Sequence, residues 1–306
     1  MDWAQVVDGF WLHRRREVSA ATVRDYDNTF RQFGAWVGEV QFEALGPDEV
    51  NGFLNHLAEL GRAPKTIANA WTALSSLWTW AETALGVEHA LRGHIKPPKV
   101  RRPVIEPYSM EQVRAMLSAC DAASSWATRG GRRAQSRRPT ALRDRAIVMV
   151  LVDTGLRASE VCALQARDYD PESGRLLVRH GKGNKERVVY AGEGCRRALW
   201  RYLVQRQEAR QRDPLFATAS GRAMTRDNLL NLVVRIAKRA GVRGANVHRF
   251  RHTFAIQFLR NGGSVLALQD ALGHERMETV RIYAKLAEVD LQAMQRAASP
   301  ADGWEL

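Results

Sequence analysis

The chain has 306 residues, of which 45% are hydrophobic and 26% charged, and its formal net charge at pH 7 is +13. This length exceeds one typical core and predicts two domains, while the composition excludes a disordered chain. No apolar run approaches the roughly 18 residues that span a bilayer, and Met1 begins no signal segment. We therefore expect a cytoplasmic protein with no membrane partner, and the basic charge indicates a polyanionic partner such as nucleic acid.

The positive charge is concentrated in the second part of the chain. Residues 1–97 contain 9 Lys and Arg against 12 Asp and Glu, whereas residues 98–306 contain 37 against 21. We therefore expect the second part of the chain to make most of the contacts with the polyanionic partner. The three cysteines, Cys120, Cys162 and Cys195, share no metal-type spacing, which favours buried thiols over a disulfide or a zinc site.

Residues 1–95 predict a domain of four helices. The first helix is expected around Trp3 to Arg15, and Ser19 is a suitable N-cap for the second. Pro47 begins the third, which Gly61 ends, and the fourth follows Pro64. The apolar positions repeat at helical spacing in each of the last three helices: Val23, Tyr26, Phe30, Phe33 and Val37 in the second, Val50, Phe53, Leu54, Leu57 and Leu60 as the buried stripe of the third, and Ile67, Trp71, Leu74, Leu77, Trp78 and Leu85 on one side of the fourth. We expect the tryptophans to pack in the core, with stacking on bases as the alternative.

Residues 96–103 form a basic linker between the two domains. Three prolines prevent a helix and favour an extended segment. Its cations are Lys96, Lys99, Arg101 and Arg102. They are expected to lie against phosphate, and a solvated basic tether is the alternative.

Residues 104–306 predict a second, mainly helical domain. Ser109 and Gln112 form a capping box for a helix that runs to about Cys120. Residues 129–138 carry five arginines without apolar periodicity, which indicates a loop that either contacts nucleic acid or is merely solvated. Thr140 restarts a helix that is apolar on all sides over residues 146–152 and should therefore be buried.

The one strong β signal is a hairpin in this second domain. Residues 176–179 and 187–190 flank the glycine-rich turn 181–185, and a third short strand is expected at residues 215–217. Further helices are expected from residue 156 onward and at about residues 194–211, 225–240 and 247–261. The fold class is thus mainly α with a small antiparallel sheet (α+β).

A set of cationic, imidazole and phenol side chains falls at the ends of these elements or in turns. Its members are Arg157, Lys182, His248, Arg251, His274 and Tyr283. Phosphodiester transfer needs cations on the non-bridging oxygens, a proton for the leaving oxygen and a base for the attacking one. The two arginines suit the first demand, and His274 near a helix N-terminus adds a donor. Lys182 could protonate the leaving oxygen, while His248 could accept the proton of Tyr283 or hold the geometry.

Each of these residues has a simpler explanation when it is taken singly. An arginine after Thr-Gly-Leu is often a surface or capping residue, and Gly-Lys-Gly is merely a turn. His248 and His252 are spaced like a zinc pair, but no acid lies between them and no third ligand is evident. The hypothesis therefore depends on the whole set.

Five motifs resemble, in order and spacing, the signature boxes of the tyrosine recombinases, a superfamily that includes phage integrases and Xer chromosome-dimer resolvases. They are residues 154–160, 181–187, 248–252 and 272–274, and Tyr283. The resemblance covers about residues 105–290, and residues 64–80 are similar to part of the core-binding domain of that family. No further DNA-binding domain precedes the bundle, so we expect the simpler Xer-like layout.

The resemblance implies a site-specific DNA recombinase whose two domains close round duplex DNA. Residues 1–95 would be a SAM-like core-binding domain, residues 96–103 the linker and residues 104–306 the catalytic domain. The tyrosine would form a 3′-phosphotyrosyl bond and release a 5′-hydroxyl. Strands would then exchange through a Holliday junction in a homotetramer, or with a paired recombinase, on nucleoid DNA, without metal, ATP or another cofactor.

The same resemblance assigns roles to individual residues. The catalytic roles fall to Arg157, Lys182, His248, Arg251, His274 and Tyr283, the nucleophile, and Glu160 braces the site. The residues expected to contact DNA are Lys65, Lys96, Lys99, Arg101, Arg102, Lys185 and Arg249. Residues 286–298 resemble a C-terminal helix that docks on a neighbouring subunit, with packing on its own subunit as the alternative.

Three other functions compete with this expectation. A type IB topoisomerase-like enzyme would use similar nicking and closing chemistry without pairing of sites. A DNA-binding accessory protein would leave the site unused, which the complete catalytic set argues against. A metal-dependent hydrolase is the most distant alternative.

Overall fold

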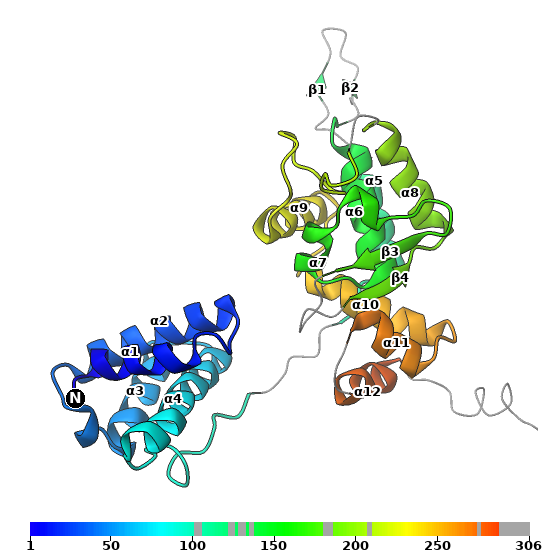
Figure 1. The fold of residues 1–306 in the computed structure, drawn as a ribbon. Coiled ribbons are helices and arrows are strands. Elements are labelled where there is room, and N and C mark those ends of the chain that lie inside the picture. The colour runs from blue at the N-terminus through cyan, green and yellow to red at the C-terminus, as the bar shows by residue number, and fades with distance from the viewer. Residues whose placement is uncertain are drawn as a thin grey trace, which may run out of the picture. The chain divides into compact units, whose positions relative to one another are not determined.

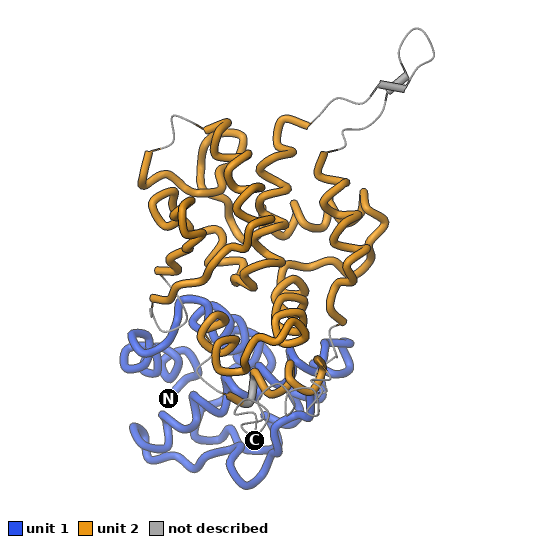
Figure 2. Tube along the Cα trace, turned by 90° about the vertical axis from the view of Figure 1, so that its right-hand side faces the viewer, with its two compact units in different colours: residues 1–103 blue, residues 104–306 orange. Residues whose placement is uncertain are grey.

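The structure, a computed structural model, describes residues 1–100, 106–121, 126–127, 133–134, 138–179, 186–206, 210–273 and 277–287. The chain divides into two compact units, unit 1 (residues 1–103) and unit 2 (residues 104–306), which Figure 2 colours separately. Each unit has a hydrophobic core of its own and is described by itself. In the described part of the chain, no helix is both long and apolar enough to cross a membrane.

Unit 1 is the predicted bundle of four helices with one added 3-10 turn, η1 (Figure 1). Its elements are α1 (Trp3–Arg14), α2 (Ala20–Val37), η1 (Phe42–Ala44), α3 (Pro47–Glu59) and α4 (Pro64–Leu85). Ser19 caps α2 as predicted, because its Oγ accepts a hydrogen bond from the backbone N–H of Thr22 at 3.1 Å. Pro47 occupies the first turn of α3, where its missing N–H costs no hydrogen bond.

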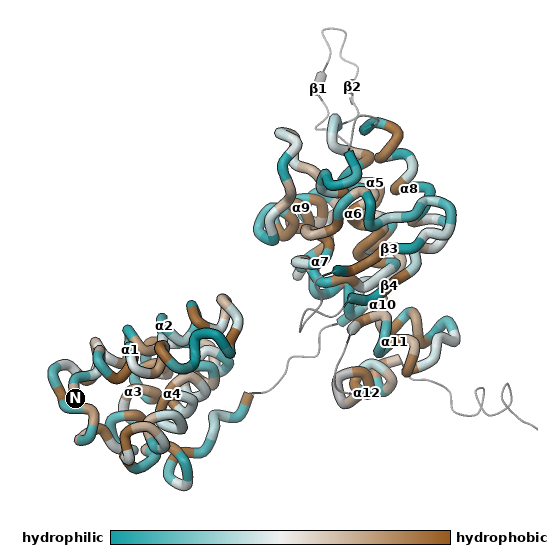
Figure 3. The backbone as a smooth tube through the Cα atoms, viewed as in Figure 1, coloured by the Kyte–Doolittle hydropathy of each residue, from teal (hydrophilic) through white to brown (hydrophobic). Residues whose placement is uncertain are grey.

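The core of unit 1 is largely aromatic. Phe10, Phe33 and Trp78 are at most 1% exposed, and hydrophobic and hydrophilic colours alternate along the helices in Figure 3, as one-sided burial requires. Core packing of the tryptophans is confirmed for most of them, whereas Trp36 is exposed and stacks on His56. The burial predicted for Leu60 was wrong, because α3 ends at Glu59 and Leu60, its C-cap, turns 56% of its surface to solvent.

Unit 2 is organised around one buried helix. Its first helices are α5 (Met110–Asp121), α6 (Ala141–Thr154), α7 (Ala158–Ala163), α8 (Glu193–Val204) and α9 (Arg226–Arg239). Helix α6 packs against α5 and α8, and its apolar run lies in the core as predicted. The capping box is present in both directions: the N–H of Gln112 donates to Ser109, and the N–H of Ser109 donates to Gln112.

The sheet of unit 2 is smaller than predicted. Strand β3 (Arg175–Val178) pairs antiparallel with β4 (Arg187–Tyr190), so the hairpin is confirmed. A second short pair, β1 (Trp126–Ala127) with β2 (Arg133–Ala134), was not predicted. The third strand expected at residues 215–217 was wrong, since that segment makes isolated bridges only and its apolar side chains fill the core.

The helix predicted at residues 194–211 was too long. Helix α8 ends at Val204, where Gln205 and Arg206 form a turn. The guanidinium of Arg206 then donates from Nη1 to the carbonyls of Pro214 and Leu215, both at 2.8 Å. These long-range hydrogen bonds favour the turn over a further helical turn, and no local sequence pattern announces them.

Three helices close unit 2 and enclose a smaller cluster of apolar side chains. They are α10 (Val247–Arg260), α11 (Val265–Leu272) and α12 (Met277–Leu286). Asn246 and Ser264 cap α10 and α11, and Gly273, at a φ of 61°, ends α11 in a left-handed conformation that favours glycine. The loop of residues 129–138, except for β2 and Arg138, and the tail from residue 288 lie outside the described residues.

The cysteines behave as the sequence predicts. Cys120 and Cys195 are buried and Cys162 is partly buried, all as free thiols. Burial raises the pKa of Cys120 to about 12 and that of Cys162 to about 11. All three are therefore core side chains rather than reactive groups.

Candidate active site

Arg251 is the most deeply buried charged side chain of the site. It is 1% exposed and projects from α10 towards the ends of two other helices. Its Nη1 donates to the carbonyl of Gly155 at 2.9 Å, and its Nη2 donates to the carbonyl of Leu272 at 2.7 Å. Burial, followed by the charge of Arg157, lowers the pKa of Arg251 to about 10, so the guanidinium stays charged at neutral pH.

Arg157 lies beside Arg251 at the start of α7. Its Nη2 donates to the carbonyl of Gly273 at 3.3 Å, next to the carbonyl that Arg251 uses. Its side chain remains 28% exposed. Two guanidiniums are thus fixed by backbone carbonyls at the end of α11, and the more exposed one is open to a ligand.

The carboxylate of Glu160, to which the family resemblance assigns a bracing role, lies between Arg157 and Arg187. It accepts four hydrogen bonds at 2.8 Å, two from Arg157 (backbone N and Nη1) and two from Arg187 (Nη1 and Nη2). Burial alone would raise the pKa of Glu160, but the hydrogen bonds from Arg187 and Arg157 lower it to about 2. The carboxylate is therefore ionised and its acceptor sites are filled.

Arg187 belongs to the same hydrogen-bond network, and no role was predicted for it from the sequence. It begins β4 and also donates from Nε to the carbonyl of Ala271 at 2.9 Å, so it ties the hairpin to α7 and α11. Its position lies inside the glycine-rich motif, but the motif gave it no separate role. Glu160 was the sequence feature that could have pointed to Arg187. A buried carboxylate needs cationic partners, and one arginine seldom donates to every acceptor site of both oxygens.

Tyr283 reaches the same region from α12 within one chain. Its side chain is 4% exposed, and its ring lies 5.3 Å from that of His252, whose ring lies 4.5 Å from that of His248. Burial raises the pKa of Tyr283, while the charges of Arg251 and Arg157 oppose that rise. The phenol is therefore a neutral O–H in this state, and the charges of Arg251 and Arg157 favour its phenolate form.

Two histidines of α10 are held neutral beside the arginines. Neighbouring atoms that replace part of its water, followed by the charges of Arg251 and Arg157, lower the pKa of His248, although the residue keeps an exposed surface. Burial, followed by His248 and Arg251, lowers the pKa of His252 to about 4. A neutral imidazole at His248 can accept a proton at neutral pH.

The other predicted residues divide into three groups. Lys65, Lys96 and Lys99 are exposed on unit 1 and its linker. Arg249 instead lies against its own unit: its guanidinium donates to carbonyls of Glu106, Pro107 and Arg243 and lies 4.2 Å from the centre of the Tyr108 ring. Its contact with DNA stays a prediction without geometric support. The residues outside the described ranges are Arg101, Arg102, Lys182, Lys185 and His274.

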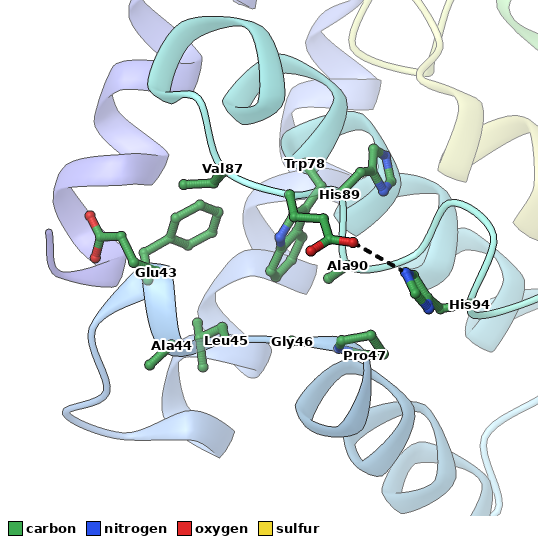
Figure 4. A pocket seen from close by; sticks show the side chains of 12 residues that line it. Glu43, Ala44, Leu45, Gly46, Pro47, Trp78, Val87, His89, Ala90 and His94 are labelled. Carbon is green, nitrogen blue, oxygen red and sulfur yellow. Dashed lines mark ion pairs between the residues drawn. The ribbon is translucent and has the colours of Figure 1, made fainter.

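A hollow in unit 1, between η1 and the segment after α4, has the wrong charge for a phosphate (Figure 4). Glu43 and Glu88 line it. Glu43 pairs with the amino group of Met1 at 2.8 Å, and Glu88 lies 3.7 Å from His94, the ion pair dashed in Figure 4. The cationic site of unit 2 is therefore the better candidate for an anionic substrate.

The comparisons with known proteins agree with this site. Residues 109–289 match the Phage integrase family, and residues 12–84 match the N-terminal SAM-like domain of phage integrases. The chain is 30% identical to tyrosine recombinase XerA of Thermococcus kodakarensis, over 92% of this chain and 90% of that protein. It is 25% identical to tyrosine recombinase XerD of Listeria monocytogenes, over 93% of this chain and 94% of that protein.

A solved structure has the same fold. It is the XerH site-specific recombinase bound to a palindromic difH substrate in a post-cleavage complex, with a TM-score of 0.73 and 22% identity. The alignment covers 99% of this chain and 85% of XerH. At this identity the likeness speaks for the fold, which agrees with the predicted mainly α architecture.

Proposed function

This chain belongs to the Phage integrase family, the tyrosine recombinases, and we propose that Tyr283 is the nucleophile with which it cuts and rejoins double-stranded DNA. The observation that carries this proposal is the convergence of Arg157, Arg251 and Tyr283 in unit 2, with the guanidinium charges acting on the phenol. The named relatives are recombinases, which does not favour a nicking-closing enzyme or an accessory protein.

In the proposed step, Oη of Tyr283 attacks a backbone phosphorus and the bond from phosphorus to O5′ breaks. The phenol proton passes to His248, and the leaving O5′ takes a proton from Lys182, which gives a 3′-phosphotyrosyl bond and a free 5′-hydroxyl. The reverse attack by another 5′-hydroxyl rejoins the strands. The covalent bond retains the phosphodiester energy, so no ATP is needed.

Arg157 and Arg251 would stabilise the charge that develops on the non-bridging oxygens. Arg251 is held in place by the carbonyls of Gly155 and Leu272, so its charge is fixed before a phosphate binds. His274 would add a donor from beside Gly273. A pair of prepositioned guanidiniums can thus take the place that metal ions hold in many phosphoryl transferases.

Tyr283 is proposed to act in an assembly on DNA. The XerH structure contains a difH substrate, which supports a duplex DNA partner for this chain as well. We infer that residues 1–95 and 104–306, joined by the linker 96–103, close round that duplex. Four protomers, or two pairs with a second recombinase, would exchange strands through a Holliday junction, and chromosomal DNA would place them in the cytoplasm.

The test is to trap the covalent intermediate. The wild-type chain, incubated with genomic fragments and nicked suicide substrates in the presence of chelator, is expected to form an adduct that resists denaturant. Sequencing of the bound DNA would identify the site. The Tyr283→Phe variant is expected to bind the same DNA and form no adduct, because it retains the ring and lacks only the nucleophilic oxygen. An adduct of undiminished yield in that variant would refute the assignment.

A further inference from the structure

Arg187 and Arg157 share one carboxylate but differ in access. Arg187 donates one hydrogen bond to each oxygen of Glu160, and Arg157 donates one from its side chain and one from its backbone N–H. The side chain of Arg187 is 11% exposed and its third donor is tied to the carbonyl of Ala271. The side chain of Arg157 is 28% exposed. Arg157 can therefore meet a phosphate, whereas Arg187 is turned inward.

The charges of this cluster explain why two arginines are needed. Arg157, Arg187 and Arg251 carry three positive charges, and Glu160, 1% exposed at its side chain, carries one negative charge beside them. Inside a protein, a charge a few ångströms away is weakly screened. Without Arg187, the carboxylate would pair with Arg157 alone and offset its charge, which would weaken the attraction of Arg157 for an approaching phosphate.

We propose that Arg187 is a positioning residue that neutralises Glu160 and so keeps the guanidinium charge of Arg157 available to the scissile phosphate. Glu160 then orients Arg157 through hydrogen bonds. Arg187 compensates the negative charge of Glu160, which would otherwise offset the positive charge of Arg157. Arg187 does not touch the substrate. This inference rests on the proposed function, since it assigns Arg157 to the phosphate.

A double-mutant cycle between Arg187 and Glu160 tests the proposal. The rate of adduct formation at saturating DNA is measured for wild type, Arg187→Met, Glu160→Gln and the double variant. Arg187→Met is expected to be slower by roughly tenfold to a hundredfold. The double variant is expected to return to within about threefold of Glu160→Gln, because no carboxylate remains to be neutralised. A double variant that stays more than about tenfold slower than Glu160→Gln would overturn the proposal.

Arg187→Met carries a risk of misfolding, because a buried carboxylate loses its main partner in that variant. Arg187→Lys is therefore measured as a second variant. Lysine keeps the positive charge and loses the planar fork, so its rate is expected to stay within about fivefold of wild type. A rate as low as that of Arg187→Met, in a folded protein, would mean that the fork and not the charge matters, and would also overturn the proposal.

The same set of variants can also be compared by DNA affinity, a measurement that needs no cleavage. In the Tyr283→Phe background, DNA affinity is expected to weaken about tenfold with Arg187→Met and to recover with Glu160→Gln added. Absence of an adduct from the wild-type chain would refute the proposed nucleophile but leave this affinity cycle intact. The two proposals therefore fail separately.

Discussion

The interior of unit 1 is built from apolar side chains, whereas that of unit 2 also contains ionised groups. Within residues 1–100, the buried polar side chains are Thr29 and His89. In the described part of unit 2, the buried charged side chains are Asp144, Glu160, Asp168 and Arg251. Removing a charge from water costs free energy, so buried charged side chains seldom serve stability alone. Their presence in unit 2 indicates that this unit carries the functional site.

The buried carboxylates of unit 2 have arginine partners. Asp144 lies 2.7 Å from Arg143, Asp168 lies 2.6 Å from Arg179, and Glu160 has two arginines. The ion pairs of unit 1 are on its surface instead, such as Arg92 with Glu82 at 2.7 Å. Unit 1 should therefore lose stability mainly when its apolar volume changes, and unit 2 also when its charges change.

The substitution expected to lower the free energy of unfolding most is one that removes a buried aromatic side chain from unit 1. Trp78 is 1% exposed and packs against Phe33 and Phe42. Trp78→Ala should lower the free energy of unfolding by about 3–5 kcal/mol, at neutral and acidic pH alike. Urea titration measures this. The matched control is Trp200→Ala on α8, a 60% exposed residue whose loss should cost less than about 0.5 kcal/mol. Equal losses in both variants would contradict the comparison.

The second effect is an acid sensitivity of unit 2 that depends on Glu160. Hydrogen bonds from Arg187 and Arg157 outweigh burial and hold its pKa at about 2, below the ordinary value of 4.5. Since the folded pKa is the lower one, the stabilisation is fully present above about pH 4.5 and is lost as pH falls towards 2. Its size is on the order of 3 kcal/mol.

Unfolding free energies measured from pH 6 to pH 2.5 test that expectation. Glu160→Gln should reduce the slope of stability against pH in this interval, because its amide does not titrate. If the variant and the wild type lose stability in parallel, the network does not hold the carboxylate ionised.

The smallest effect should come from a surface ion pair of unit 1. Arg92 and Glu82 are 60% and 39% exposed at their side chains. Arg92→Gln should change the free energy of unfolding by no more than about 1 kcal/mol, and by less in high salt. Thermal unfolding at low and high salt is the measurement. A larger loss that persists in salt would show that unit 1 also depends on charge.

Local signals predicted most helix boundaries. The N-cap at Ser19, Pro47 in the first turn of α3 and the capping box of Ser109 and Gln112 act within one turn of chain, so the sequence carries them directly. The errors came from distant contacts. Residues 215–217 are apolar enough for a strand, but among the described residues this segment forms isolated bridges only. Helix α8 ends before Arg206, whose guanidinium donates to the carbonyls of Pro214 and Leu215.

The candidate site shows the same division. Arg157, His248, Arg251 and Tyr283 could be selected from the sequence because their chemistry suits phosphate transfer. Arg187 could not, because its side chain acquires a role only when β4 lies beside α7 and α11. Arg249, chosen for its charge, is engaged instead by carbonyls 6 to 143 residues away in the chain.

By itself, the sequence determined the helical bundle of unit 1, the hairpin, the family motifs and the basic balance of unit 2. Periodicity, caps and side-chain chemistry are properties of short segments, so they can be read without a fold. Only the tertiary structure decided which arginine meets solvent and which is turned inward. That distinction depends on a carboxylate of α7, carbonyls at the end of α11 and the position of strand β4, and the distances between such elements have no local signal.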